Sequence, residues 1–105
     1  MAIFVYLRFR LAETADLQDF EGDMQAMSEL AETQPGYVWS EMGRSMQDQL
    51  VYVVVSEWDD IDDVRGWEHH GVHADIQRKW EQHQQEPLVH RRFTPWERPA
   101  QNVDP

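Results

Sequence analysis

The sequence contains no cysteine among its 105 residues. Disulfide bonds, thiolate nucleophiles, iron–sulfur clusters and cysteine zinc sites are therefore excluded together, and a metal ion would need histidine and carboxylate ligands. The sequence also has no apolar run long enough to span a bilayer, and no charged and then apolar leader follows Met1. We therefore expect a cytoplasmic protein with no membrane-spanning segment.

Positive charge is scarce in this chain. Lysine and arginine together number 9 against 20 aspartates and glutamates, which gives a net charge of -11. Such a charge repels phosphate backbones and anionic lipid, so we exclude nucleic acid and membrane surfaces as partners. Hydrophobic residues make up 41% of the chain, an ordinary share for a globular protein, and the length suits one domain with a small core.

Several segments have the pattern of β-strands. The run from Val51 to Val55 has no polar interruption and is rich in β-branched residues, which predicts a strand that is covered on both faces. The start of the chain is also apolar and then alternates. We predict strands over residues 3–11, 37–44, 50–58 and 88–96, with a hairpin loop over 45–49.

Helical regions separate these strands. The first begins after Thr14, a predicted N-cap, and its apolar positions are Leu17, Phe20, Met24, Met27 and Ala31. The second begins after Asp59 or Asp60 and is broken or bent at Gly71. Beyond Gly71 the apolar stripe consists of Val72, Ile76, Trp80 and His83.

The order of these elements is strand, helix, strand, strand, helix, strand. This order predicts an α+β fold, the ferredoxin-like βαββαβ arrangement, with an antiparallel sheet and both helices on one face. The other face then needs a cover, so we predict a homodimer whose sheets pack face to face, with an apolar pocket between each sheet and its own helices. Residues 1–97 form the domain, and residues 98–105 are expected to be a flexible C-terminal tail.

The motifs around the strands and the second helix resemble those of a known family. They are QPGY at 34–37, YVVVSEW at 52–58, and WEHHGVH at 67–73, in which a tryptophan is followed by histidines at three and six residues. The chain resembles the antibiotic biosynthesis monooxygenase (ABM) domain family of dimeric α+β barrels. The resemblance implies a small-molecule monooxygenase or a relative of one, since the family includes cofactor-free oxygenases of polycyclic aromatic phenols, haem-degrading enzymes and proteins without known reactions.

A cofactor-free oxygenase needs an apolar slot, a base and a group that stabilises the phenolate. Candidate slot walls are Trp39, Trp58 and Trp67, and the candidate bases are His70 and His73. Candidate phenolic donors are Tyr6, Tyr37 and Tyr52, and the candidate partners of the anion are Arg91 and Arg92, of which alternation allows only one to face the pocket. Each residue also has a plainer interpretation: Trp67 as core, His73 as a hydrogen-bonded residue at a helix start, and the arginines as surface ion pairs.

Haem is the alternative cofactor. In the haem-degrading branch a helix tryptophan presses against the porphyrin, a histidine nine or ten residues later ligates the iron, and the first strand carries an asparagine. Here Ile76 and Gln77 stand at those distances from Trp67, and residues 3–11 contain no asparagine. His73 would be a ligand only in a shifted register.

No metal site is predicted. His69 and His73 are four residues apart, a spacing that places two imidazoles on one helical face, but Gly71 interrupts that helix. No nucleotide-binding glycine motif is present either. The leading hypothesis is therefore oxygenation of a small aromatic or phenolic molecule without a cofactor, and the alternatives are a haem-binding or haem-degrading protein and a non-enzymatic dimer that binds small ligands.

Overall fold

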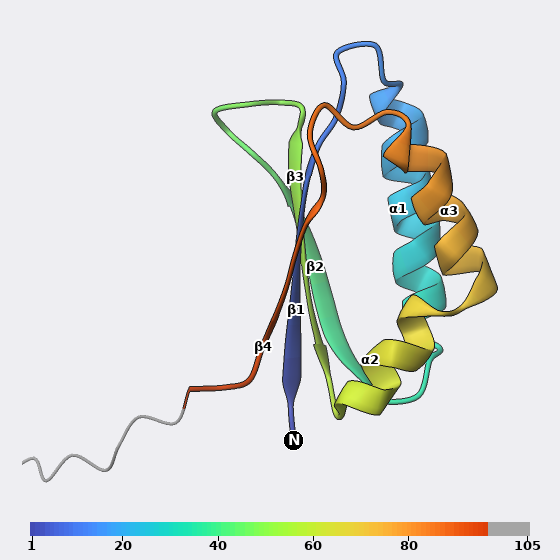
Figure 1. Cartoon of the computed structure of the whole chain (residues 1–105), viewed down its shortest axis with the longest axis vertical. Coiled ribbons are helices and arrows are strands. Elements are labelled where there is room, and N and C mark those ends of the chain that lie inside the picture. The colour runs from blue at the N-terminus through green and yellow to red at the C-terminus, as the bar shows by residue number, and fades with distance from the viewer. Residues whose placement is uncertain (97–105) are drawn as a thin grey trace, which may run out of the picture.

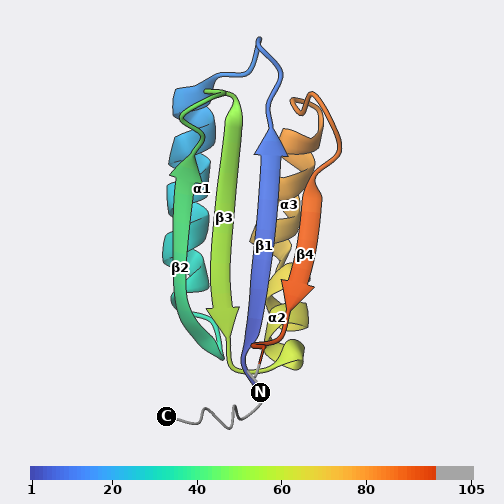
Figure 2. The same ribbon diagram turned by 90° about the vertical axis from the view of Figure 1, so that its left-hand side faces the viewer.

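The computed structural model describes residues 1–96 and shows one antiparallel sheet with helices on one of its faces (Figures 1 and 2). The order of the four strands in the sheet is β2-β3-β1-β4. The elements are β1 (Ile3–Arg10), α1 (Leu17–Ala31), β2 (Tyr37–Arg44), β3 (Val51–Trp58), α2 (Ile61–Glu68), α3 (Gly71–Glu81) and β4 (Val89–Phe93). The predicted ferredoxin-like fold is thereby confirmed, while the predicted tail lies outside the described residues.

Two boundaries differ from the prediction by two or more residues. The N-cap of α1 is Asp16 and not Thr14, because the helix begins at Leu17 and the Asp16 carboxylate accepts the Asp19 N–H at 3.1 Å. The last strand ends at Phe93 and not at Trp96. Phe93 pairs with Phe4, close to the first residue of β1, so β1 offers almost no further residue with which 94–96 could pair. The second helical region is broken as predicted, with α2 ending at Glu68 and α3 beginning at Gly71.

The core lies between the sheet and the helices. One cluster of buried residues consists of Phe9, Leu11, Phe20, Met24, Tyr52 and Trp80, and the other of Ile3, Val5, Ala31, Trp58 and Val64. The predicted stripe of α3 needs a correction, because Val72 is 49% exposed and the buried positions are His73 and Trp80. Ile76 and Trp80 of the predicted stripe do pack in the core, whereas His83 is exposed, and His73, seven residues before Trp80, is buried in place of Val72.

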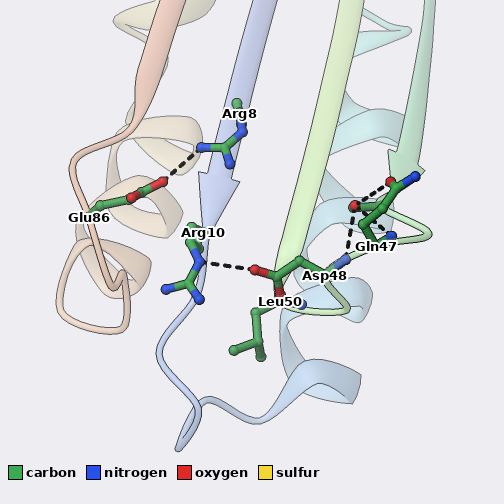
Figure 3. Close-up of polar contacts among 7 residues, drawn as sticks. Arg8, Arg10, Gln47, Asp48, Leu50 and Glu86 are labelled. Atoms are coloured by element: carbon green, nitrogen blue, oxygen red, sulfur yellow. Dashed lines mark hydrogen bonds and ion pairs between the residues drawn. The ribbon is translucent and has the colours of Figure 1, made fainter.

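Ion pairs connect the end of β1 to the neighbouring loops (Figure 3). Arg10 donates from Nε to the Asp48 carboxylate at 3.1 Å, and Arg8 contacts Glu86 at 2.7 Å. Asp48 also accepts the Leu50 N–H at 3.0 Å, and this hydrogen bond, assisted by Arg10, lowers the pKa of the Asp48 carboxyl. Asp48 therefore anchors the loop that connects β2 to β3.

Among the glycines of residues 1–96, Gly36 is the one where a side chain would collide with a neighbour. Its φ is 79°, and a Cβ at this position would collide with the Asp63 carboxylate of α2. We expect Gly36→Ala to lower the free energy of unfolding by about 1–3 kcal/mol, through left-handed backbone strain and the displacement of Asp63. Urea denaturation measures this change.

Gly22, in the middle of α1, supplies the matched control. A Cβ at Gly22 meets no atom within 4 Å. Gly22→Ala should therefore raise the free energy of unfolding by about 0.5–1 kcal/mol, because alanine is the better helix former. Equal effects of the two substitutions would contradict the special role of Gly36.

None of the helices among residues 1–96 is long and apolar enough to cross a membrane.

Candidate functional site

A cavity of about 510 Å³ lies between the sheet and the helices. Its walls are mostly apolar side chains that face each other from the two layers, among them Val5, Leu7, Phe9, Met24, Met27, Val54, Ile76 and Leu88. Polar side chains are fewer and include Ser56, Glu68, His73 and His90. A cavity of this size and composition is typical of sites that bind small organic molecules.

Stacked rings form one wall of the cavity. Trp58, at the end of β3, is fully buried, and its ring stacks on Trp67 of α2 at 6.0 Å between centroids and 25° between planes. Trp67 stacks in turn on His73 of α3 at 4.4 Å and 20°. All three residues border the cavity. Trp58 is fully buried and Trp67 only partly, so Trp67 has the accessible ring surface that a planar ligand can contact.

His73 is a buried imidazole with one nitrogen held and the other free. Its Nδ1 lies 2.9 Å from the Trp67 carbonyl oxygen. A carbonyl only accepts, so this hydrogen bond assigns the proton to Nδ1 and leaves Nε2 of the neutral ring as an acceptor. Nε2 of His73 has no hydrogen bond within residues 1–96. In the same residues, every side-chain nitrogen or oxygen that is fully shielded from solvent has a hydrogen-bond partner. Nε2 therefore keeps accessible surface, in a residue that lines the cavity.

Burial lowers the pKa of His73 below its ordinary value of 6.5, against a smaller opposing effect of the hydrogen bond to Trp67. The ring is only 8% exposed, so the charged form would lose most of its hydration. His73 is therefore neutral near neutral pH, which is the state in which Nε2 can take a proton.

The lowered pKa of His73 predicts a pH dependence of stability. Below 6.5 the unfolded chain binds a proton at this residue more readily than the folded protein does. The free energy of unfolding should therefore fall as pH drops from 6.5 towards the folded pKa of His73, and this contribution should level off below it.

Urea denaturation at several pH values, on the wild type and on His73→Gln, measures this effect. Glutamine does not titrate, so the difference in stability between the two proteins should change with pH in that window. A constant difference would contradict a buried neutral His73.

A polar cluster stands where α2 approaches β4. The Glu68 carboxylate forms an ion pair with Arg92 and lies 3.1 Å from Nε2 of His90. Glu68 and His90 line the cavity. His90 pairs with Leu7 and Arg92 with Val5, two residues that face the cavity, so alternation places both on the helix-covered side of β4 and Arg91 on the opposite side. Of the two arginines, Arg92 is therefore on the helix-covered side, where it binds Glu68 without lining the cavity itself.

Several predicted site residues lie on the bare face of the sheet. Tyr6 alternates with Val5 and Leu7 and pairs with Arg91, so both lie on the face away from the helices. Trp39 is on that face too, where its Nε1 donates to Glu57 at 2.9 Å. None of Tyr6, Trp39 and Arg91 lines the cavity.

Two other candidates have structural surroundings. Tyr52 is 1% exposed, and its hydroxyl donates to the Glu21 carboxylate at 2.6 Å; burial, together with Glu21, raises its pKa to about 12. His70 is the N-cap of α3 and accepts the Val72 N–H at 3.2 Å through Nδ1. Neither residue lines the cavity, so the structure brings together Trp58, Trp67 and His73 from the predicted set, with Arg92 behind Glu68.

Glu68 and His90 are cavity residues that the sequence analysis did not single out. The alternation of β4 places His90 and Arg92 on one face, which is a signal in the sequence, but no spacing rule connects them to Glu68 on a helix. His69, the other histidine considered for a metal, is exposed and bonded to the Arg65 carbonyl at 2.7 Å. Residues 1–96 contain no group of three or more histidines and carboxylates that could hold a metal ion.

Comparison with known proteins gives a family and a fold. Residues 2–79 match the family model described as antibiotic biosynthesis monooxygenase. No curated protein matches the chain. The structure of Rv0793 from Mycobacterium tuberculosis is similar, with a TM-score of 0.84 at 11% identity, over 95% of this chain and 100% of that one.

Two further solved structures are similar. SnoaB, a cofactor-independent oxygenase from Streptomyces nogalater, has a TM-score of 0.80 at 18% identity, over 95% of this chain and 98% of its own. PA3566 from Pseudomonas aeruginosa has a TM-score of 0.80 at 10% identity, over 91% and 95%. At these identities the structural likeness shows the fold alone.

Proposed function

We propose that this chain, which belongs to the antibiotic biosynthesis monooxygenase family, oxygenates an aromatic phenol in the cavity between its sheet and helices, without flavin or metal. The observation that carries the proposal is the free Nε2 of a buried, neutral His73 in an aromatic wall of that cavity. The description of SnoaB as a cofactor-independent oxygenase supports a reaction of this kind. A cytoplasmic location is kept as part of the proposal.

The chemistry begins with the loss of the phenolic proton. A phenol whose ring lies against Trp67 brings its hydroxyl near the wall that contains His73, and Nε2 accepts the proton while Nδ1 still donates to the Trp67 carbonyl. The phenolate is electron-rich enough to react with dioxygen. One oxygen atom becomes a ring carbonyl and the other leaves as water, so that the substrate itself is the reductant and the product is a quinone.

The apolar walls have a separate role. Leu7, Met24 and Val54 exclude water from the ring and from the reacting oxygen. In the proposal Trp67, with Trp58 packed behind it, contacts the ring, His73 is the base, and Arg92 holds the Glu68 carboxylate in an ion pair. Tyr52 supports the core through Glu21, and His70 supports the start of α3.

The bare face of the sheet is proposed to bind a second copy of the chain. Apolar side chains occupy its centre, namely Phe4, Tyr6, Val53, Val55 and Val89, all only partly buried, with Phe93 51% exposed at one edge. An apolar sheet face of this extent needs a cover. Trp39 and Arg91 lie on the same face, and we assign them to the dimer interface.

Val55→Asp should dissociate the proposed dimer. A carboxylate at the centre of an apolar interface loses its hydration without gaining a partner, so we expect the dissociation constant to rise about tenfold or more. Light scattering coupled to gel filtration measures the mass. Val72→Asp, the same change on the helix layer, is the control and should stay dimeric; a monomeric wild type would contradict the dimer.

A haem-binding or haem-degrading activity is the second candidate, because the free Nε2 of His73 could ligate iron. The lining weighs against it, since within residues 1–96 it includes the carboxylates Glu21 and Glu68 but no lysine or arginine to bind the propionates. A titration with hemin, alongside His73→Ala, tests it: a saturable Soret shift that the substitution abolishes would favour haem. A protein that binds phenols without consuming oxygen would instead be a non-enzymatic binding module.

A further inference from the structure

We infer that His90, oriented by Glu68, is the cationic catalytic residue of this site, whose imidazolium stabilises the phenolate that forms when His73 takes the proton. The inference rests on the proposed function, because it concerns the same cavity and the same substrate. It adds a second histidine with a role opposite to that of His73. Glu68 is a positioning residue in this account, since it acts through His90.

The first step of the argument is the charge of the cavity wall. A phenolate in an apolar cavity needs a positive charge or a strong donor beside its oxygen. The described lining residues include no lysine or arginine, while Glu21 and Glu68 contribute only negative charge. His73 and His90 are the histidines among these residues, so the cation has to come from one of them.

The nearby arginines are engaged elsewhere. The Arg92 guanidinium binds the Glu68 carboxylate. Arg91 lies on the bare face and donates to the His90 carbonyl at 3.0 Å. Arg44 stands 3.9 Å from Glu21, an acid that already accepts the Tyr52 hydroxyl. An arginine as the direct partner of the anion, which the sequence analysis predicted, is therefore less suited to this cavity than a histidine.

The surroundings of the two histidines divide the roles. His73 is almost fully buried against Trp67, which favours the neutral ring and leaves Nε2 as a base. The His90 side chain is 38% exposed and has a carboxylate 3.1 Å from its Nε2. Glu68 accepts the Nε2–H of His90 and supplies the counter-charge of an imidazolium, whose Nδ1–H is then a free donor.

The groups that face His90 come from every neighbouring element. Glu68 approaches from α2 and His73 from α3, while Arg92 lies two residues along β4 on the same side. On β1 the adjacent cavity residues are Val5 and Leu7, which carry no charge. Glu21 of α1 is a further carboxylate of the cavity wall. Glu41 of β2 also borders the cavity, but it pairs with Val55, so alternation places its carboxylate on the bare face. Among these charged groups, the Glu68 carboxylate is the one in contact with His90.

The test uses para-nitrophenol, a phenol whose ionised form absorbs visible light. The probe is added to the full-length protein, and its ionisation is followed by absorbance across pH for the wild type, His90→Gln and His69→Gln. We expect the acid dissociation constant of the bound probe to be about tenfold smaller in His90→Gln than in the wild type, so that the pKa of the probe is about one unit higher. His69→Gln changes an exposed histidine next to Glu68 and should match the wild type.

A charge-restoring variant separates this role from a structural one. His90→Lys places a cation beside Glu68 and should return the ionisation of the bound probe to the wild-type value or beyond it. If the wild type binds the probe and the bound probe ionises equally in His90→Gln, this inference is overturned and the proposed function stands. Absence of binding to the wild type would overturn both.

Discussion

Replacement of His73 by alanine is expected to lower the rate of oxygen consumption with a phenolic substrate by about 100-fold to 10,000-fold, the range that general base catalysis contributes. The reason is geometric. Nδ1 is tied to the Trp67 carbonyl at 2.9 Å, so Nε2 is the nitrogen that can accept the proton, and the ring is stacked on Trp67 at 4.4 Å. The substitution removes the base and leaves the rest of the wall.

Two variants show whether the loss is one of base or of shape. His73→Gln keeps a polar side chain of similar reach but cannot take the proton, so it should be as slow as His73→Ala. His83→Ala removes an exposed histidine that does not line the cavity and should keep wild-type activity. Added imidazole should restore part of the rate in His73→Ala. An alanine variant that keeps more than about a tenth of the wild-type rate would contradict the role of His73.

Phe20→Ala is expected to cause the largest loss of stability, about 3–5 kcal/mol, as for other buried phenylalanines. Phe20 of α1 is fully buried and contacts three other rings, with centroids 5.6 Å from Phe9, 4.9 Å from Tyr52 and 5.1 Å from Trp80. It is therefore the point where α1, α3 and the sheet meet. Because Phe9 and Trp80 also line the cavity, its removal should loosen that wall as well.

Urea denaturation at equilibrium measures the loss, which is a large part of the roughly 5–15 kcal/mol that stabilise a typical domain. Met46→Ala is the control, because Met46 is 95% exposed in the loop between β2 and β3 and should change stability little. A loss below about 1 kcal/mol for Phe20→Ala would contradict the packing of the helices described here.

The architecture was predictable because local patterns and topology rules agree. The uninterrupted run of Val51 to Val55 indicated a strand, and these residues do lie in β3. The helical spacing from Leu17 to Ala31 indicated α1 within its observed bounds. Alternation along β4 also showed that His90 and Arg92 share a face. In each case the information is contained in neighbouring residues.

The site was predictable only in part, because its geometry depends on contacts between elements. Trp67 and His73 were found through a motif within one short stretch of chain. Glu68 was missed because its partner Arg92 is 24 residues away on a strand, and the ion pair depends on how α2 docks on the sheet. Tyr52 is a member of the strand that was predicted best, yet alternation alone could not show that it packs into the core against Phe20 and away from the cavity.

The measurement that tests the central claim most directly is isotope incorporation from ¹⁸O₂. Purified protein, treated with a chelator and free of flavin, is mixed with a panel of mono- to tetracyclic phenols, and the products are analysed by mass spectrometry. We predict a quinone with a single ¹⁸O atom. Its rate of formation should rise with the concentration of wild-type protein and should be lost in His73→Ala. Product that forms equally fast without protein or with His73→Ala, or that carries no ¹⁸O, would contradict this account.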